Sequence, residues 1–249
     1  MLRCGDPAKF IVQHARYGEI RPDLYAYTQM AFRRIVATGL WFAVLFGAAG
    51  RIDWLRGWIY VAASLTALLV TDVVVRRANP VVLDAREKWR RKETKPFDKV
   101  FLLIFALFFF LQPAIAGLDA VRFRWSSIPA WAIYVGLTFF AVGSTLVAWT
   151  LAVNPHAEST VRIQTDRGHA VISAGPYQIV RHPMYLGIIL GYLGGPLILG
   201  SMWALSISGV LIALFVARTA LEDRTLSHEL QGYKEYAVKT RYRLAPGLW

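Results

Sequence analysis

The residues best suited to chemistry lie between Gly168 and Gly187, where polar, ring-bearing and glycine residues lead into an apolar segment. The triplet Arg181-His182-Pro183 stands directly before that apolar segment. Pro183 suits the first turn of a helix, because its missing N–H group has no partner to lose there. His182 is then expected at a helix N-terminus, where free backbone N–H groups and the helix dipole favour an anion such as a carboxylate. The stretch therefore predicts chemistry at a membrane surface.

Further candidate residues flank this triplet. Gly175 and Pro176 form a turn that places Tyr177 at the membrane surface. Tyr185 and Gly187 follow in the first turn of the expected helix, where a glycine lets a ligand approach the backbone closely. The pattern predicts a binding site at the start of this helix.

A second polar cluster follows the last apolar segment. Arg218 and Glu222 are four residues apart and share a helix face, with Asp223 and Arg224 beside them. The same spacing is equally typical of an ion pair on the surface at the end of a membrane helix, with no role in binding. The interpretation depends on how the helices that carry the two clusters are arranged.

Apolar segments must position these residues, and they lie at about 33–50, 55–75, 99–118, 129–153 and 183–217. The last has roughly 35 residues, which is too long for one crossing of a hydrocarbon core that needs about 20. Glycine and proline residues near its middle favour a break, which gives a hairpin of 183–198 and 202–217. The sequence thus predicts an all-α, polytopic integral membrane bundle of about six transmembrane helices, ending in a C-terminal helical hairpin and a cytoplasmic tail.

The hairpin brings the two polar clusters together, because the cytoplasmic ends of antiparallel neighbours meet. We therefore expect Arg181, His182 and Tyr185 to face Arg218 and Glu222 across one pocket. The C-terminal tail is amphipathic and aromatic, so it can lie over that pocket as a lid or stack on a purine ring.

Charge sets the orientation. Of the 28 Lys and Arg residues, 24 fall in the two tails and in the loops 76–99 and 154–182, whereas the opposite side holds only four. By the positive-inside rule, both termini and both loops are expected to be cytoplasmic. The basic run at 86–95 is expected to contact anionic lipid headgroups. No nucleic-acid recognition motif accompanies the net charge of +12, so no nucleic-acid partner is predicted.

Two features of the apolar segments predict helix contacts. Gly136, Gly143 and Ser144 allow close packing of 129–153 against a neighbour. Asp72 lies inside an apolar segment and is expected to pair with Arg76, one helical turn away.

Metal binding is the weaker interpretation of the 154–182 loop. His156 and Glu158 are possible ligands, but their spacing fits no common zinc pattern and the chain has a single cysteine, Cys4. No metal site is predicted, and one cysteine also excludes an intramolecular disulfide.

The motifs together resemble a known superfamily. They are His169 ahead of Gly175-Pro-Tyr177, then Arg181-His-Pro-Met-Tyr185-Leu-Gly187, Glu222-Asp223, Gly232-Tyr-Lys-Glu-Tyr236 and Arg243-Leu-Ala-Pro246. This combination resembles the isoprenylcysteine carboxyl methyltransferase and phospholipid methyltransferase superfamily. The resemblance covers roughly residues 154–249, and the first 150 residues are similar only in spanning a membrane. Asp223 departs from the paired glutamates usual in that family, and its shorter side chain has less reach.

The resemblance implies a methyltransferase that uses S-adenosylmethionine, bound between the last hairpin and the C-terminal tail. The residues that it implies for the cofactor site are His169, Gly175, Tyr177, His182, Pro183, Tyr185, Gly187 and Glu222. Arg181 and Arg218 resemble arginines that orient an acceptor carboxylate in isoprenylcysteine enzymes, and with Glu222 they form the expected catalytic set. The expected acceptor is a lipophilic carboxylate in the membrane, with a phospholipid amine or a thiol as alternatives. A carboxylate needs no general base, whereas an ammonium or a thiol must first lose a proton.

The whole chain, 1–249, is expected to be one membrane domain, with a tail and four transmembrane helices in 1–153 and the catalytic region in 154–249. Two other function classes remain open. Membrane sterol and steroid reductases carry a similar Arg-His-Pro-Asn-Tyr-Gly element and use NADPH, but Met184 replaces the Asn here. A lipid-binding accessory protein would bind no cofactor at all.

Overall fold

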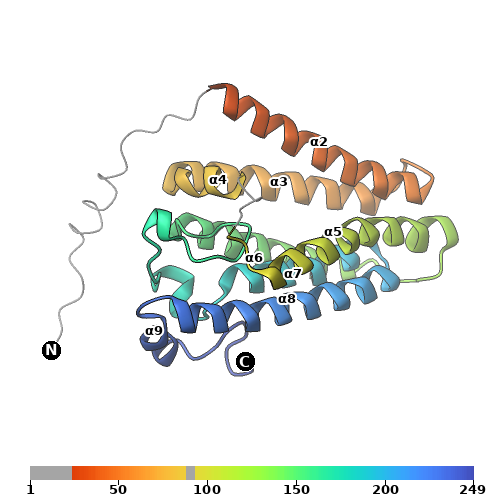
Figure 1. Cartoon of the computed structure of the whole chain (residues 1–249). Coiled ribbons are helices and arrows are strands. Elements are labelled where there is room, and N and C mark those ends of the chain that lie inside the picture. Colours follow the sequence, from red (N-terminus) through yellow and green to blue (C-terminus); the bar gives the residue numbers. More distant parts are fainter. Residues whose placement is uncertain (1–23, 88–92) are drawn as a thin grey trace. The chain divides into compact units, whose positions relative to one another are not determined.

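The structure is a computed structural model that describes residues 24–87 and 93–249 (Figure 1). Cys4, most of the N-terminal tail and the centre of the basic run at 86–95 lie outside the described residues. Contacts divide the chain into two units, one ending at Gly39 and the other spanning Leu40–Trp249. The elements of the described ranges are α2 (Leu24–Ala49), α3 (Leu55–Ala78), α4 (Pro80–Glu87), α5 (Pro96–Gly117), the π-helical η1 (Leu118–Phe123), α6 (Ala132–Val153), the 3-10 helices η2 (Thr165–Arg167) and η3 (Gly175–Gln178), α7 (Pro183–Leu199), α8 (Met202–Glu229) and α9 (Tyr233–Lys239). All regular structure in these ranges is helical, as predicted.

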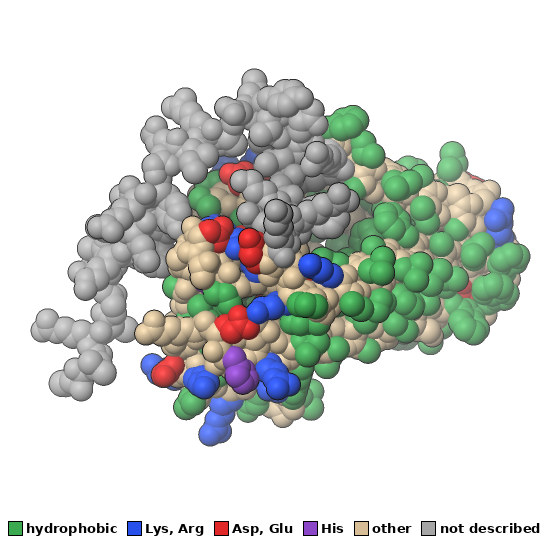
Figure 2. Space-filling model, viewed as in Figure 1, with side chains coloured by type: hydrophobic (Ala, Val, Ile, Leu, Met, Phe, Trp, Pro, Cys, Tyr) green, Lys and Arg blue, Asp and Glu red, His purple; other side chains and the backbone are tan. Residues whose placement is uncertain are grey.

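The apolar segments of the sequence form helices α2, α3, α5, α6, α7 and α8. Four helical stretches, α3, α5 with η1, α6 and α8, are long and apolar enough to cross a bilayer. The apolar part of α2, Ile35–Ala49, and α7 are shorter. In Figure 2 hydrophobic side chains dominate the right of the view, and charged side chains gather mainly at the left, where Figure 1 places α9. The polytopic helical membrane fold is confirmed, and the count of six crossings stays a prediction, as does the single domain.

Helices α6 and α7 pack against each other through glycines. A Cβ atom on Gly136 would lie 2.7 Å from the carbonyl oxygen of Gly194, and one on Gly187 would lie 2.6 Å from that of Gly143. Since real Cβ atoms do not approach backbone this closely, these positions require glycine. The close packing predicted for Gly136 and Gly143 is confirmed.

The C-terminal hairpin breaks at Gly200 and Ser201. Gly200 has a φ of 82°, in the left-handed region that favours glycine, and ends α7. The Ser201 hydroxyl accepts a hydrogen bond from the Ala204 N–H at 2.9 Å and so caps α8. The predicted helix limits are confirmed at this turn, whereas Pro196, which also suggested the break, lies inside α7.

The carboxylate of Asp72 has the partner expected from the sequence. Arg76 Nη2 donates to Asp72 Oδ1 at 2.9 Å, one turn along α3. This pairing offsets the charge of a carboxylate inside a membrane-spanning helix.

Candidate functional site

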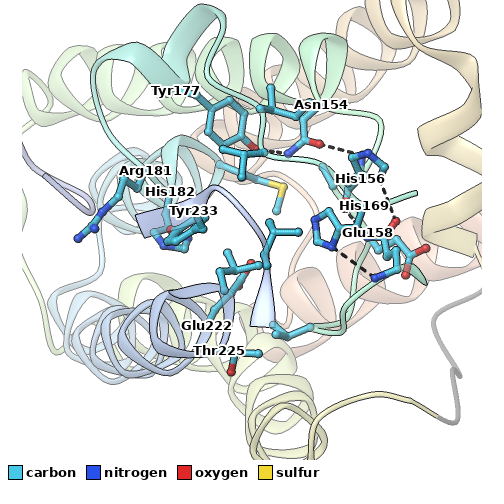
Figure 3. A pocket seen from close by; sticks show the side chains of 18 of the residues that line it. Asn154, His156, Glu158, His169, Tyr177, Arg181, His182, Glu222, Thr225 and Tyr233 are labelled. Carbon is cyan, nitrogen blue, oxygen red and sulfur yellow. Dashed lines mark hydrogen bonds between the residues drawn. The ribbon is translucent and has the colours of Figure 1, made fainter. Parts of the chain in front are cut away.

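A polar cavity lies at the N-terminal end of α7, bounded by the 154–182 loop, α7, α8 and the C-terminal tail (Figure 3). Six of the ten residues predicted for the site line it: His169, Tyr177, Arg181, His182, Tyr185 and Glu222. Others in the lining include Asn154, His156, Gln164, Met184, Thr225, Tyr233 and Tyr236. Figure 3 shows Glu222 and Thr225 on the side opposite Tyr177 and Asn154.

Tyr185 and Glu222 join the two hairpin helices at one wall of the cavity. The Tyr185 hydroxyl donates a hydrogen bond to the Glu222 carboxylate. The Tyr185 ring stacks on the His182 ring, with centroids 5.7 Å apart and planes 8° from parallel. Because Tyr185 is only 4% exposed, its orientation is fixed by packing. The wall therefore presents a carboxylate that is suited to a cationic ligand group.

Asp223 lies next to Glu222 in sequence but outside the cavity lining. Its carboxylate accepts hydrogen bonds from Tyr233 Oη at 2.8 Å and from Arg243 Nε at 2.9 Å. His182 Nε2 lies 3.4 Å from the same carboxylate, which is 3% exposed. Asp223 thus ties the C-terminal tail to α7 and α8. Asp223, where the superfamily that the sequence resembles usually has a second glutamate, therefore holds the tail and does not line the cavity.

The tail also pairs with the backbone before α7. The Arg181 N–H donates to the carbonyl of Tyr242 and the His182 N–H to that of Arg243, both at 2.9 Å. The His182 N–H group is therefore not free to bind a ligand anion, while the expectation that the start of α7 favours an anion stays a prediction. These two hydrogen bonds satisfy backbone groups of both segments.

Gly175, Pro183 and Gly187 lie outside the cavity and have structural roles. Gly175 has a φ of 59° and packs against Trp149 at the turn before Tyr177. Pro183 is buried in the first turn of α7, as predicted. The space at Gly187 is filled by Gly143 of α6, so the expected approach of a ligand there is wrong.

Arg218 does not line the cavity, which corrects the expectation that it faces the pocket. It is 7% exposed, and its guanidinium carbon lies 5.2 Å from the Tyr185 ring centroid and 4.4 Å from that of Phe101. Arg218 Nε lies 2.8 Å from Asp98 Oδ1, and Nη2 donates to the carbonyl of Ser159 at 3.0 Å. Arg218 stands behind Tyr185 because the buried carboxylate of Asp98 attracts it there.

Ion pairs brace the 154–182 loop. Glu158 is buried and accepts from Arg162 Nε at 2.8 Å and from Arg167 Nη1 at 3.2 Å. Asp166 accepts from Arg162 Nη1 at 2.7 Å, and these carboxylates help to raise the pKa of Arg162 despite burial. These ion pairs thus hold the loop in one conformation around η2, although η2 and η3 are its only regular elements.

His156 and His169 lie side by side in the cavity wall, with ring centroids 4.8 Å apart. Burial, together with the neighbouring His156, lowers the pKa of His169 to about 4. Burial also lowers the pKa of His156. Both rings are therefore neutral near pH 7. In the described part of the chain, no three His, Cys, Asp or Glu side chains are grouped so that they could hold a metal ion.

Tyr177 links the loop to the tail. Asn154 Nδ2 donates to its hydroxyl at 2.6 Å, and Tyr236 Oη donates to its carbonyl at 2.8 Å. Burial raises the pKa of Tyr177, so its hydroxyl stays protonated.

The segment that builds most of this cavity is similar to a known protein family. Residues 131–231 match the phospholipid methyltransferase family. The match extends from the start of α6 to just beyond α8, and so includes the 154–182 loop and the α7–α8 hairpin. It confirms the resemblance to integral membrane methyltransferases over this segment, and it points to a membrane methyltransferase.

A curated protein similar to part of the chain is the cobalt-zinc-cadmium resistance protein CzcN of Cupriavidus metallidurans. It is 36% identical over 85 residues, which cover 31% of this chain and 37% of the relative. The chain therefore spans well under half of that relative, and the likeness concerns a segment only.

Sequence reasoning missed Asp98 and the contributions of Asn154, Met184 and Thr225 to the lining. Asp98 follows Pro96 in the first turn of α5, a common place for an acidic residue near the positive end of the helix dipole. Nothing in its local pattern indicates a partner on α8.

Proposed function

We propose that this protein transfers a methyl group from S-adenosylmethionine to a lipophilic acceptor held in the membrane. The observation that carries the proposal is the cavity in which the Tyr185–Glu222 wall faces a polar loop, within the segment that matches the methyltransferase family. The described helices on either side are apolar enough to lie in a bilayer.

The lining fits the chemical groups of this cofactor. The Glu222 carboxylate would attract the sulfonium and the ammonium of the cofactor. The purine would stack on an uncharged aromatic ring, such as the neutral imidazole of His169 or the ring of Tyr233. Arg162 and Arg181 are the arginines of the lining. Arg162 is paired with Glu158 and Asp166, so Arg181, whose Nε lies 3.3 Å from Asp223, is our candidate for meeting a carboxylate. When bound, the cofactor would supply an electrophilic methyl group on a sulfonium.

The chain's own contribution would be binding and alignment. Displacement at a methyl carbon proceeds in line, so holding the two reactants at the right distance and angle would be the chain's main means of accelerating it. The buried Tyr185 fixes one wall and the tail covers another. We expect a water-soluble cofactor to enter from the loop side and a lipophilic acceptor from the bilayer side.

A carboxylate is our first candidate for the acceptor, because Arg181 lines the cavity and can orient it. A carboxylate oxygen would attack with its own lone pair, and the bound cofactor would supply the methyl group and keep the bonding electrons on sulfur, so the chain would have no proton to remove. The product would be a methyl ester.

A phospholipid amine is the second candidate, favoured by the description of the matching family. Its phosphate would meet Arg181, and its ammonium would have to lose a proton before attack.

We further propose that the cavity lies on the cytoplasmic side together with both termini, because 24 of the 28 Lys and Arg residues fall on that side of the predicted topology. The basic loops would then contact anionic headgroups.

Calorimetric binding of S-adenosylhomocysteine to the detergent-purified full chain tests the proposal, with NADPH as the parallel ligand. We expect micromolar binding of the first alone, and its loss in Glu222→Ala. Glu235→Ala removes an exposed carboxylate on α9 and should bind like the wild type. Binding of NADPH alone would indicate a reductase in place of a methyltransferase. If neither ligand bound, the proposal would be refuted. Labelled methyl transfer to a prenyl-cysteine carboxylate or to phosphatidylethanolamine vesicles then decides between the acceptors.

A further inference from the structure

Asp98 is a fully buried carboxylate outside the segment that matches the family. It lies in the first turn of α5 and is 0% exposed. Its Oδ2 accepts from the Val161 N–H at 2.8 Å, and its Oδ1 lies 2.8 Å from Arg218 Nε. Removing a charge from water is costly, so a buried carboxylate is retained where a cation compensates it.

Arg218 connects this carboxylate to the cavity wall. Its guanidinium lies against the Tyr185 ring, and the Tyr185 hydroxyl donates to Glu222. Contacts therefore run from Asp98 on α5 through Arg218 on α8 to Tyr185 on α7 and back to Glu222 on α8.

The charges along this path decide the electrostatic character of the wall. Arg218 is 7% exposed, so water screens its charge weakly. Without Asp98, this cation would stand uncompensated behind Tyr185 and would offset the negative charge of Glu222. With Asp98 in place, the Asp98–Arg218 pair is neutral and Glu222 keeps its attraction for cations.

We propose that Asp98 is a positioning residue that holds and neutralises Arg218, and so makes the cavity prefer the sulfonium form of the cofactor to the neutral thioether product. This inference rests on the proposed function. It assigns to the N-terminal half of the chain a part in the selectivity of the site.

Asp98 also has an ordinary structural contact, because it anchors the loop at Val161. Loss of that contact would loosen the cavity and weaken both ligands alike. The ratio of the two dissociation constants therefore separates the electrostatic role from a structural one.

The test is calorimetric titration of the full chain with S-adenosylmethionine and, separately, with S-adenosylhomocysteine. Asp98→Asn keeps the shape and an oxygen acceptor for Val161 but removes the charge. We expect its affinity for the sulfonium form to fall about tenfold more than its affinity for the thioether, the order of magnitude expected for one weakly screened charge left uncompensated near the site. Asp98→Glu, which restores the charge, should return the ratio toward the wild-type value.

A double variant, Asp98→Asn with Arg218→Gln, leaves no unpaired cation and should also keep the wild-type ratio. Equal weakening of both ligands in Asp98→Asn, or a double variant with the same altered ratio as the single one, would overturn the inference. Failure of the wild type to bind either ligand would instead overturn the proposed function.

Discussion

Replacing Asp223 with Asn should release the C-terminal tail from the bundle. Asp223 receives hydrogen bonds from Tyr233 and Arg243 and lies 3.4 Å from His182. Asn keeps one acceptor oxygen, so the variant loses the charge and one of the two short hydrogen bonds. The tail is also held by its backbone pairing at Arg181 and His182, which the substitution leaves in place.

The expected effect follows from the exposure of the partners. A hydrogen bond to a charged group contributes about 1.5 to 3 kcal/mol. The Arg243 side chain is 35% exposed, so in the variant water can replace part of its lost hydrogen bond to Asp223. We therefore take about 2 kcal/mol for the change in the free energy of tail opening. This corresponds to a roughly 30-fold larger open population, since about 1.4 kcal/mol is a factor of ten.

Limited trypsin digestion of the detergent-purified protein measures that population, because cleavage of a transiently opened segment follows its equilibrium when reclosing is fast. We expect cleavage after Lys239 and Arg241 to accelerate about 30-fold in Asp223→Asn. Glu235→Gln is the matched control, since it makes the same charge change at an exposed position of α9. Cleavage of Asp223→Asn at the control's rate would refute the assignment of Asp223 as the anchor of the tail.

Three further predictions concern the bundle and the loop. Gly187→Ala should lower the melting temperature through a clash of its methyl group with Gly143. Gly191→Ala on the same helix meets open space and should not lower it, because alanine favours a helix more than glycine does. The pKa of about 4 for His169 lies below the unfolded value of about 6.5, so only the unfolded state takes up that proton between these values. Stability should therefore fall as the pH drops from about 6.5 to 4, and His169→Gln should reduce that fall in a pH series of melting temperatures. Asp119→Asn should lower the melting temperature, because buried Asp119 accepts from Ser201 Oγ at 2.5 Å, but it should leave cofactor affinity unchanged; a loss of affinity would contradict a purely structural role.

Much of the fold could be predicted because membrane helices have a simple physical signature. Each needs an apolar run long enough for a hydrocarbon core, and the excess length of 183–217 required a turn. The glycine positions on α6 indicated a close neighbour, but nothing in the sequence pattern identified the glycines of α7 as the partners. That pairing depends on the relative height of two helices, which no local pattern encodes.

The site was predicted less completely, and Arg218 shows why. Spacing places Arg218 and Glu222 on one helix face, yet a face is wide enough for one side chain to reach the cavity while the other turns inward. A carboxylate far away in the sequence, Asp98, decides which one turns. Gly187 was misassigned for a similar reason, since a missing side chain admits a ligand or a neighbouring helix equally well.

The glycine contact between α6 and α7 has a consequence for how the cavity can change over time. Helices whose backbones touch cannot slide or tilt independently without collision, so the two behave as one rigid body. Both ends of the 154–182 loop are attached to that body, at the end of α6 and the start of α7. Extra residues in such a loop add little to the entropic cost of closing it, because that cost grows slowly with length. Insertions and deletions between the two helices can therefore reshape the cavity, and with it the range of ligands, while the membrane-embedded part stays as it is.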